Sequence, residues 1–350
     1  MSSLLLATST LILCTSEAFQ TGGFSPQQPS FLLPPKHDSS PPTTTRLDMA
    51  RVSPSADNTV GIVGRGYVAT LAAKLASTRG YDTWMLCPAG QEPTITQLID
   101  TNTEDGTELP SNLRLVNAAD EDVMESCLSK TSALIVSIDD IEGLISEDAL
   151  RYLCNPTSSP NLKRVVGMSR NLNGQGMGFL VSASRRTANA EVWDNSNTAE
   201  YKAYEELLKD CASNCGADYT IVRAGTLKGG GCGDVMSEDG DAYYPHYLSP
   251  RFYEMTKKDI VTWQLLFDCK VRGVTMSKGD VMVGPGGKAI LTATAAEECR
   301  GDTSRCAIAE AMVRSLDMES AANVDFGVAT KEARVPPTDE EWEEMFQVLA

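Results

Sequence analysis

The chain has 350 residues, of which 42% are hydrophobic and 22% are charged, a composition typical of a globular protein with a buried core. Its formal net charge is −17, so the chain as a whole repels nucleic-acid phosphates and anionic lipid, and we expect neither as a partner. An anionic cofactor would need a local binding device such as a helix N-terminus.

The first 58 residues are predicted to form a targeting presequence. A short apolar segment, residues 4–14, has the length of a secretory signal core and is too short to span a bilayer. SEAFQ follows with a cleavage point expected between Ala18 and Phe19, and then comes a stretch rich in Ser, Thr and Pro. Together these features resemble the bipartite plastid presequences of algae with secondary plastids, which predicts the chloroplast stroma. Secretion and a merely disordered tail are the alternatives.

From residue 59 onward, strand-like and helix-like segments alternate. Strands are predicted at 59–64, 81–87, 113–118, 132–138, 163–169, 218–225 and 324–329. Helices are predicted at 121–128, 145–154, 198–212, 303–316 and after Thr338, which forms a capping box with Glu341. The alternation predicts an α/β fold: a doubly wound parallel-sheet Rossmann fold in a single domain, residues 59–350, with an irregular insertion at about 228–300. We expect no transmembrane segment after residue 58.

The segment VGIVGRGYVATLAAKLA, residues 60–76, places a glycine turn between the first strand and a helix. Its pattern is Gly64-x-Gly66-x-x-Ala69. In a dinucleotide-binding turn the first glycine permits the bend, the second lets a pyrophosphate approach the backbone, and the third small residue lets the helix pack on the strand. The N–H groups that open the helix, at Tyr67 and Val68, would bind phosphate without any net positive charge. We therefore predict dinucleotide binding here; a turn that has lost its ligand is the alternative.

The choice between NAD and NADP rests on the end of the second strand. An acidic residue there would bind the NAD ribose, and a basic residue nearby would bind the 2′-phosphate of NADP. The strand ends at Cys87, which is neither. Arg65, inside the glycine turn, could reach a 2′-phosphate, which favours NADP weakly. An equally reasonable interpretation makes Arg65 a solvated loop residue.

The chain has ten cysteines and only two histidines, without zinc-ligand spacing or a regular cysteine framework. We therefore predict no metal site and interpret the cysteines as small buried hydrophobic residues. Only Cys211 and Cys215 lie close together in sequence, and a redox-sensing thiol pair is the alternative for these two.

Three stretches resemble the atypical short-chain dehydrogenase/reductases, the NmrA-like and plastid NAD(P)-binding group. They are KRVVGMS (163–169), DYTIVRAGTL (218–227) and TSRCAIAEAMVRSL (303–316). The resemblance implies a Rossmann fold and an NAD(P) cofactor. By the same resemblance Ser169 stands at the position of a catalytic serine, with a capping role as the alternative. Asp120 stands at an adenine-side position, or else starts a helix. Ser137 and Ile138 would line the nicotinamide side.

The chain departs from that family at two places. The family's turn is one residue longer, Gly-x-x-Gly-x-x-Gly, and its catalytic Tyr-x-x-x-Lys pair is missing. Tyr201 is the candidate proton donor, but Glu205 stands four residues later, and Lys202 points about 100° away on a helix. In that pair the lysine lowers the pKa of the tyrosine.

Two functions therefore remain open. One is a plastid NAD(P)H-dependent oxidoreductase with an unknown small-molecule substrate, and the other is a non-catalytic nucleotide-binding scaffold or assembly factor with a plastid protein partner. Isomerase or epimerase chemistry with a tightly held cofactor is a third, lesser alternative.

Overall fold

The computed structural model describes residues 51–100, 108–174, 195–233, 247–256, 260–281 and 301–349. These residues belong to one compact unit that starts at Ala50. The predicted presequence up to residue 50 and parts of the predicted insertion lie outside the described ranges. Within those ranges, no helix has the length and hydropathy that a bilayer crossing requires.

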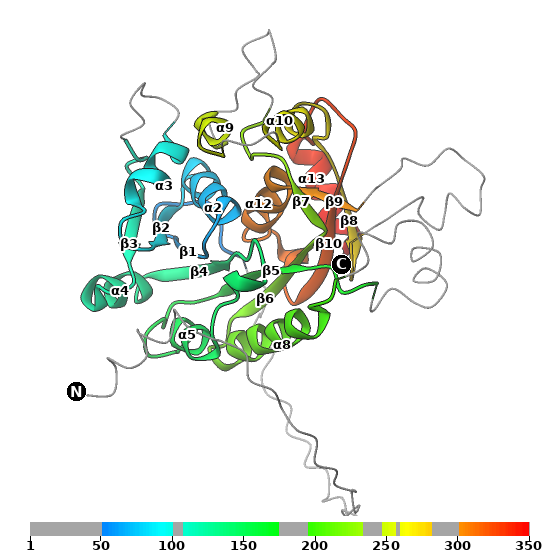
Figure 1. Cartoon of the computed structure of the whole chain (residues 1–350). Coiled ribbons are helices and arrows are strands. Elements are labelled where there is room, and N and C mark those ends of the chain that lie inside the picture. Colours follow the sequence, from blue (N-terminus) through cyan, green and yellow to red (C-terminus); the bar gives the residue numbers. More distant parts are fainter. Residues whose placement is uncertain are drawn as a thin grey trace, which may run out of the picture. The chain divides into compact units, whose positions relative to one another are not determined.

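An eight-stranded sheet forms the centre of the fold (Figure 1). In spatial order its strands are β3 (Leu113–Asn117), β2 (Asp82–Cys87), β1 (Thr59–Val63), β4 (Thr131–Val136), β5 (Arg164–Arg170), β6 (Asp218–Ala224), β10 (Val324–Lys331) and β8 (Gly273–Lys278). All neighbouring pairs are parallel except β10 with β8. The order 3-2-1-4-5-6 is that of a doubly wound Rossmann sheet. The predicted fold class is therefore confirmed.

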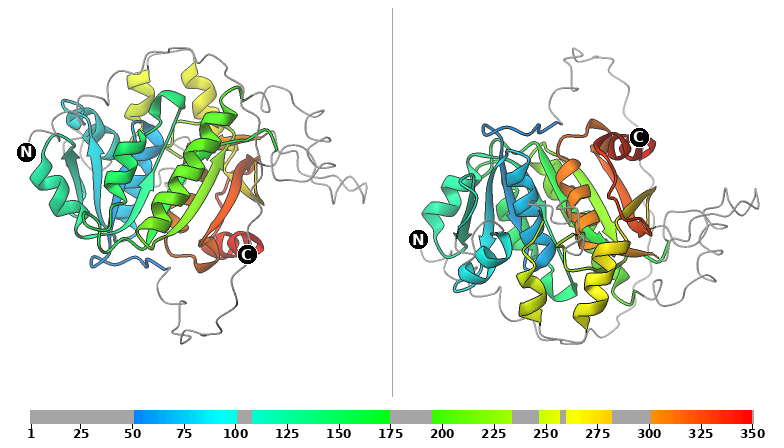
Figure 2. Two further views of the ribbon diagram at one scale, coloured as in Figure 1. Left: turned by 90° about the horizontal axis from the view of Figure 1, so that it is seen from below. Right: turned by 90° about the horizontal axis from the view of Figure 1, so that it is seen from above.

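Helices cover both faces of this sheet, as Figure 2 shows from opposite sides. One face carries α2 (Tyr67–Thr78), α3 (Glu92–Ile99), α12 (Arg305–Arg314) and α13 (Asp339–Leu349). The other face carries α4 (Glu121–Leu128), α5 (Glu147–Leu153) and α8 (Thr198–Asn214). Two further helices, α9 (Arg251–Thr256) and α10 (Ile260–Lys270), and a small sheet of β7 (Thr226–Lys228) with β9 (Asp302–Ser304) complete the described elements. Two hydrophobic clusters thus fill the two layers.

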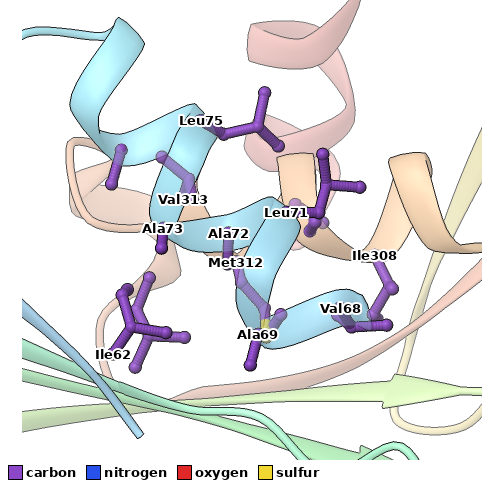
Figure 3. Packing of buried hydrophobic residues seen from close by; sticks show 14 of the residues in the cluster. Ile62, Val68, Ala69, Leu71, Ala72, Ala73, Leu75, Ile308, Met312 and Val313 are labelled. Carbon is purple, nitrogen blue, oxygen red and sulfur yellow. The ribbon is translucent and has the colours of Figure 1, made fainter. Parts of the chain in front are cut away.

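Helix α2 lies against the sheet because its inner positions are small. Its alanines at 69, 72, 73 and 76 are fully buried. Figure 3 shows Ala73 on the side of Ile62 of β1, within one cluster that includes Met312 and Val313 of α12. A face without bulk allows the helix to approach the strand closely, which is the third requirement of the dinucleotide-binding turn.

The packed chain begins before the predicted boundary at residue 59. Val52 is fully buried in the cluster on the α2 face. Its N–H donates to the carbonyl of Leu316, and its carbonyl accepts from the hydroxyl of Tyr81 at 2.8 Å. A single valine between Pro- and Ser-containing stretches gives no periodic signal, so local patterning did not show that these residues are folded.

The predicted insertion at 228–300 is only partly separate from the sheet. It contains β8, which pairs antiparallel with β10 at the sheet edge, from Gly273 opposite Lys331 to Lys278 opposite Phe326. The prediction that this whole region lies beside the sheet is therefore wrong for β8. Its segment GVTMSK alternates apolar and polar residues over only four positions, Val274 to Ser277, and this short signal was missed.

The C-terminal helix begins as predicted. The backbone N–H of Thr338 donates to Glu341 at 2.8 Å, and the backbone N–H of Glu341 donates to the Thr338 hydroxyl at 3.3 Å. This reciprocal pair is a capping box. Arg314 of α12 pairs with Asp339 at 2.7 Å and lowers the pKa of that carboxyl. The capping box and the ion pair fix the start of α13 beside α12.

Replacing Ala73 by Leu should destabilise the fold, because extra side-chain volume must enter the space between α2 and β1. We expect a loss of about 1–3 kcal/mol in the free energy of unfolding, measured by urea denaturation. Ala203, exposed on α8, is the matched control, and Ala203→Leu should change stability by less than about 0.5 kcal/mol. Equal effects of the two substitutions would contradict the close packing of α2.

Candidate functional site

The glycine turn after β1 leaves no room for side chains. A Cβ atom on Gly64 would lie 2.3 Å from the carbonyl oxygen of Ser137, which follows β4. Gly66 has a φ of +136°, and a Cβ atom there would lie 2.5 Å from the carboxylate carbon of Asp139. The turn is therefore held tightly against the segment that follows β4, and only glycine fits at either position.

The N-terminus of α2 holds a carboxylate. Asp139 Oδ2 accepts hydrogen bonds from the backbone N–H groups of Tyr67 at 3.2 Å and of Val68 at 3.5 Å. Its other oxygen, Oδ1, is buried and has no hydrogen-bond partner. These two N–H groups are the ones predicted to bind a cofactor phosphate. The structure thus shows that they bind an anionic group, and that the group here belongs to the chain itself.

Two arginines flank this carboxylate. Arg170, the last residue of β5, donates to the backbone carbonyl of Asp139 at 3.1 Å. Arg305, the first residue of α12, lies with its guanidinium carbon 5.9 Å from the ring centre of Tyr67, and its buried Nε has no hydrogen-bond partner. Burial raises the pKa of Asp139, whereas the charge of Arg305 and the two N–H groups act in the opposite direction. The result is a locally positive site in a strongly acidic protein.

The two predicted catalytic residues lie on the α8 side of the sheet. A Cβ atom on Gly167 of β5 would touch Leu208 and Tyr204 of α8, and Ser169, two residues further along β5, faces the same side. The Ser169 hydroxyl is fully buried and has no hydrogen-bond partner. Tyr201 is the first buried residue of α8. The catalytic roles of Ser169 and Tyr201 stay predictions.

The charge near the Tyr201 phenol comes from Arg170. Burial raises the pKa of Tyr201, and the positive charge of Arg170 opposes that rise. Burial in turn lowers the pKa of Arg170, whereas Tyr201 and Asp139 raise it. Arg170 therefore connects the predicted proton donor with the carboxylate at the N-terminus of α2.

Glu205 occupies the position where a Tyr-x-x-x-Lys pair would have its lysine. It forms a buried two-pronged ion pair with Arg223 of β6, with distances of 2.9 Å from Nε and 2.6 Å from Nη2. Arg223 also contacts Asp325 at 2.6 Å. Burial alone would lower the pKa of Arg223, but Glu205 and Asp325 raise it above its usual value. Arg223 is therefore held by two carboxylates and has a structural role.

Three other predicted cofactor residues have local partners. Arg65 donates to the backbone carbonyl of Glu142 at 2.6 Å, in the turn η2 (Ile141–Gly143) that follows β4. It therefore extends toward the β4 side of β1, away from β2. The thiol of Cys87 is buried at the end of β2, and burial raises its pKa to about 11. Asp120 caps α4 by accepting from the N–H of Val123 at 3.2 Å, which is the alternative considered for it.

Ser137 and Ile138 lie where β4 ends. Both are buried, and the Ser137 hydroxyl contacts the sulfur of Met168 at 3.6 Å. The backbone N–H of Ser137 donates to the carbonyl of Val63, which extends the pairing of β4 with β1 up to the glycine turn. Ser137 and Ile138 therefore lie next to the glycine turn. The side chain that contacts the turn, however, is that of Asp139.

A separate cavity of about 160 Å³ lies beside α12, lined by Asp268, Cys306, Glu310, Arg314 and Trp342 among others. Residues 306, 310 and 314 share one face of α12, whereas Ile308 and Met312, in the cluster with α2, lie on the opposite face. Asp268 in this cavity is buried and accepts from the hydroxyl of Tyr253 at 2.6 Å, and burial raises its pKa to about 6. The cavity is therefore on the far side of α12 from the glycine turn.

No cluster of metal-ligand side chains occurs in the part of the chain that the structure describes.

Sequence reasoning missed Asp139, Arg170 and Arg305. Each stands directly after a residue that was singled out or inside a quoted motif: Asp139 follows Ile138, Arg170 follows Ser169, and Arg305 belongs to TSRCAIAEAMVRSL. A charged residue just past the carboxyl end of a central strand was the available signal, because ligands of such sheets bind at that edge.

Comparisons with known proteins find only distant similarity to solved structures. The sequence matches no known protein-family profile and no curated protein sequence. Among solved structures, a short-chain dehydrogenase/reductase of the wide type from Veillonella parvula, in complex with NADP, is 15% identical, with 82% of this chain and 97% of that chain covered and a TM-score of 0.42. A Bacillus halodurans protein described as an NAD-dependent epimerase/dehydratase is also 15% identical, with 83% and 100% covered and a TM-score of 0.43. An anaerobilin reductase from Escherichia coli O157:H7 is 12% identical, with 80% and 100% covered and a TM-score of 0.41. Similarity at this level does not say what this chain binds.

Removing one partner of the Glu205–Arg223 pair should be costly, because it leaves a buried charge unpaired. We expect Arg223→Met to lower the free energy of unfolding by about 3–5 kcal/mol, and the double substitution Arg223→Met with Glu205→Leu to cost less than the two single changes added together. The exposed pair Arg151–Glu147 on α5 is the control, where Glu147→Gln should cost less than about 1 kcal/mol. Additive losses in denaturant unfolding would show that the pair is not coupled.

Proposed function

We propose that this chain binds a nicotinamide dinucleotide at the Gly64–Val68 turn and acts as an NAD(P)H-dependent oxidoreductase of the atypical short-chain dehydrogenase/reductase type. One observation carries the proposal: the N–H groups at the start of α2 bind an anionic group between two arginines, at the carboxyl edge of a 3-2-1-4-5-6 sheet. Between β1 and β4 the strand order reverses direction, and ligands of doubly wound sheets bind at this point.

The turn fits a pyrophosphate in every respect but one. Gly64 and Gly66 permit the tight turn, and the buried alanines let α2 pack against β1. The carboxylate of Asp139 stands on the N–H groups that the pyrophosphate needs. A phosphate carries more charge and more acceptor oxygens than a carboxylate, so it can replace Asp139 there. Displacement of Asp139 is therefore part of the proposed binding.

The chemistry proposed for the chain's own residues is proton transfer. A bound nicotinamide supplies hydride transfer. Tyr201 would hold the proton at its phenol oxygen, Arg170 would stabilise the phenolate by its charge, and Ser169 would offer a hydroxyl on the same side of the sheet. In this assignment Arg170 supplies the positive charge that the lysine of a Tyr-x-x-x-Lys pair would supply. Glu205, which stands at the position of that lysine, is paired with Arg223.

A non-catalytic nucleotide-binding scaffold is the second candidate. The observation that favours it is the buried Glu205–Arg223 pair, which places a structural ion pair where the family has its catalytic lysine. A scaffold of this kind would bind the dinucleotide, keep Asp139 as an internal competitor and present a surface to a plastid protein.

Location in the plastid is proposed from the presequence pattern of residues 1–58 alone. A fluorescent fusion of those residues tests it, and secretion of the fusion would refute it.

NADP is proposed over NAD only on the presence of Arg65 in the turn. The hydrogen bond of Arg65 to Glu142 means that its side chain would have to turn toward β2 to meet a 2′-phosphate. Parallel titrations of the chain with NADPH and NADH, followed by calorimetry, test both the binding and the preference. Absence of binding to either cofactor at millimolar concentration would refute the proposal.

Gly66→Asp should abolish dinucleotide binding, because it puts a second carboxylate against Asp139 where a pyrophosphate must lie. We expect affinity to fall by at least about 100-fold, or ~2.7 kcal/mol, in the same titration. Gly80→Asp is the matched control: Gly80 also has a positive φ, lies at the other end of α2 and has open space around it. Unfolding curves of both variants show whether the fold is kept. Equal affinity of the two variants would exclude this turn as the site.

Asp139→Asn should strengthen dinucleotide binding, because it removes the internal anion. We expect an increase in affinity of about 10-fold, or ~1.4 kcal/mol, at neutral pH. The pKa of Asp139 is raised, so affinity of the unaltered chain should fall as pH rises through that pKa and the carboxylate becomes charged. Asp139→Asn should remove this dependence. Asp140→Asn removes an exposed neighbour whose charge raises the pKa of Asp139, so it should move the dependence to lower pH and keep its sign. Weaker binding by Asp139→Asn would mean that Asp139 supports the ligand.

Tyr201→Phe separates the two candidate functions. In the oxidoreductase it should keep dinucleotide affinity and lower turnover by about 100-fold or more, measured as loss of reduced-nicotinamide absorbance with a panel of aldehydes, ketones and quinones. Tyr152→Phe, at an exposed position of α5, should leave turnover unchanged. If the unaltered chain binds NAD(P)H but oxidises none with any acceptor, the scaffold is the better assignment.

A further inference from the structure

The cavity beside α12 has no part in the proposed dinucleotide site, because it lies on the other side of that helix. Its volume is about 160 Å³. A protein cavity of about 150 Å³ holds a benzene molecule, so this one has room for a compact ligand of about six non-hydrogen atoms. Its lining includes the half-buried Pro336 and Pro337 as well as Asp268, which is only 2% exposed. The cavity thus connects a partly exposed edge with a buried carboxylate.

The carboxylate of Asp268, on α10, is held in place by one of its two oxygens. Its Oδ2 accepts hydrogen bonds from the backbone N–H groups of Gly230 at 2.8 Å and Cys232 at 3.4 Å, and from the hydroxyl of Tyr253 at 2.6 Å. The loop after β7 approaches so closely that a Cβ atom on Gly229 would lie 2.1 Å from Oδ1. The glycine-rich loop and α9 therefore fix the position of this carboxylate.

The other oxygen of Asp268 lacks a donor. Oδ1 is buried and accepts no hydrogen bond within the described residues. Burial raises the pKa of Asp268 to about 6, whereas its three donors and the charge of Arg305 act in the opposite direction. The carboxylate is therefore ionised at neutral pH. A buried, charged oxygen without a donor is costly, and a ligand that supplies a donor would remove that cost.

The two arginines of the cavity lining have partners in the protein. Arg314 pairs with Glu310 at 2.9 Å and with Asp339 at 2.7 Å. Arg272 donates to the backbone carbonyl of Arg334 at 3.0 Å. The positive groups are thus bound to acceptors of the chain, whereas Asp268 has acceptor capacity left. This difference favours a ligand with a charged donor over an anion.

The rest of the lining includes an apolar wall. Trp342 of α13, Val274 of β8 and Ala307 of α12 line the cavity together with the two prolines, and the Trp342 side chain is buried. Pockets that bind small molecules typically combine such apolar walls with a few fixed polar groups. A ligand that fits would therefore carry a compact apolar body beside its charged donor.

We propose that this cavity binds a small organic ammonium ion, whose charged N–H group donates to Asp268 Oδ1 while its apolar body contacts Trp342 and the two prolines. Hydrogen bonds between two ionised groups are shorter and stronger than neutral ones, so the ammonium charge should add affinity. The site is independent of the glycine turn. Failure of either proposal leaves the other standing.

The test is calorimetric titration of the full chain at neutral pH with two probes of the same size. Cyclopentylamine is protonated under these conditions, and cyclopentanol is its neutral counterpart. We expect one cyclopentylamine molecule to bind per chain, at least about 10-fold more tightly than cyclopentanol. Equal affinity for the two probes, or no saturable binding of the amine, would overturn the proposal.

Asp268→Asn tests the role of the carboxylate, because it keeps the shape of the side chain and an acceptor for the three donors. It should weaken cyclopentylamine binding by about 10-fold and leave cyclopentanol binding unchanged. Asp302→Asn is the matched control: Asp302 lies on β9, pairs with Lys228 and is not part of the cavity lining, so the preference for the amine should remain. Unchanged amine affinity in Asp268→Asn would refute the assignment.

Cys306→Leu tests the location, because Cys306 lines the cavity from α12 and a larger side chain would occupy part of its volume. Binding of both probes should weaken, and urea unfolding curves show whether the fold is kept. Gly66→Asp, at the glycine turn, should bind the amine as the unaltered chain does. Amine affinity that falls in Gly66→Asp but not in folded Cys306→Leu would place the amine at the turn and overturn the proposal.

Discussion

The contact between the carboxylate of Asp139 and the N-terminus of α2 is the constraint on which the carboxyl edge of the sheet depends. It requires a glycine at position 66, because any side chain there would collide with the carboxylate, and it holds the turn after β1 against the segment after β4. The close approach of Gly64 to the carbonyl of Ser137 is part of the same contact. Strand pairing, the tight turn and the position of α2 are thus coupled through one buried anion.

A chain with a net charge of −17 can still bind an anion if positive potential is concentrated at one point. Here three sources meet: the N–H groups that open α2, Arg170 at the end of β5 and Arg305 at the start of α12. The helix contributes by its dipole, and the low local dielectric strengthens each charge. This arrangement binds an internal carboxylate in the structure described here, and the same physics favours phosphate.

A buried ion pair lies one helical turn after Tyr201. Glu205 pairs there with Arg223, and that pair joins α8 to β6. Such a pair holds geometry more than it adds stability, because the cost of desolvating two charges offsets most of their attraction. The positive charge near the Tyr201 phenol comes from Arg170 of β5.

Most strands and helices, the doubly wound fold class, the glycine turn and the capping box at Thr338 could be predicted from the sequence. They depend on local periodicity and on the backbone needs of a few neighbouring residues. Local patterning did not predict which charged side chains meet at the glycine turn. Asp139, Arg170 and Arg305 come from three separate elements, and only the pairing of β4 and β5 and the docking of α12 on α2 bring them together. Side-chain contacts between distant segments depend on tertiary packing, and only the tertiary structure decided them.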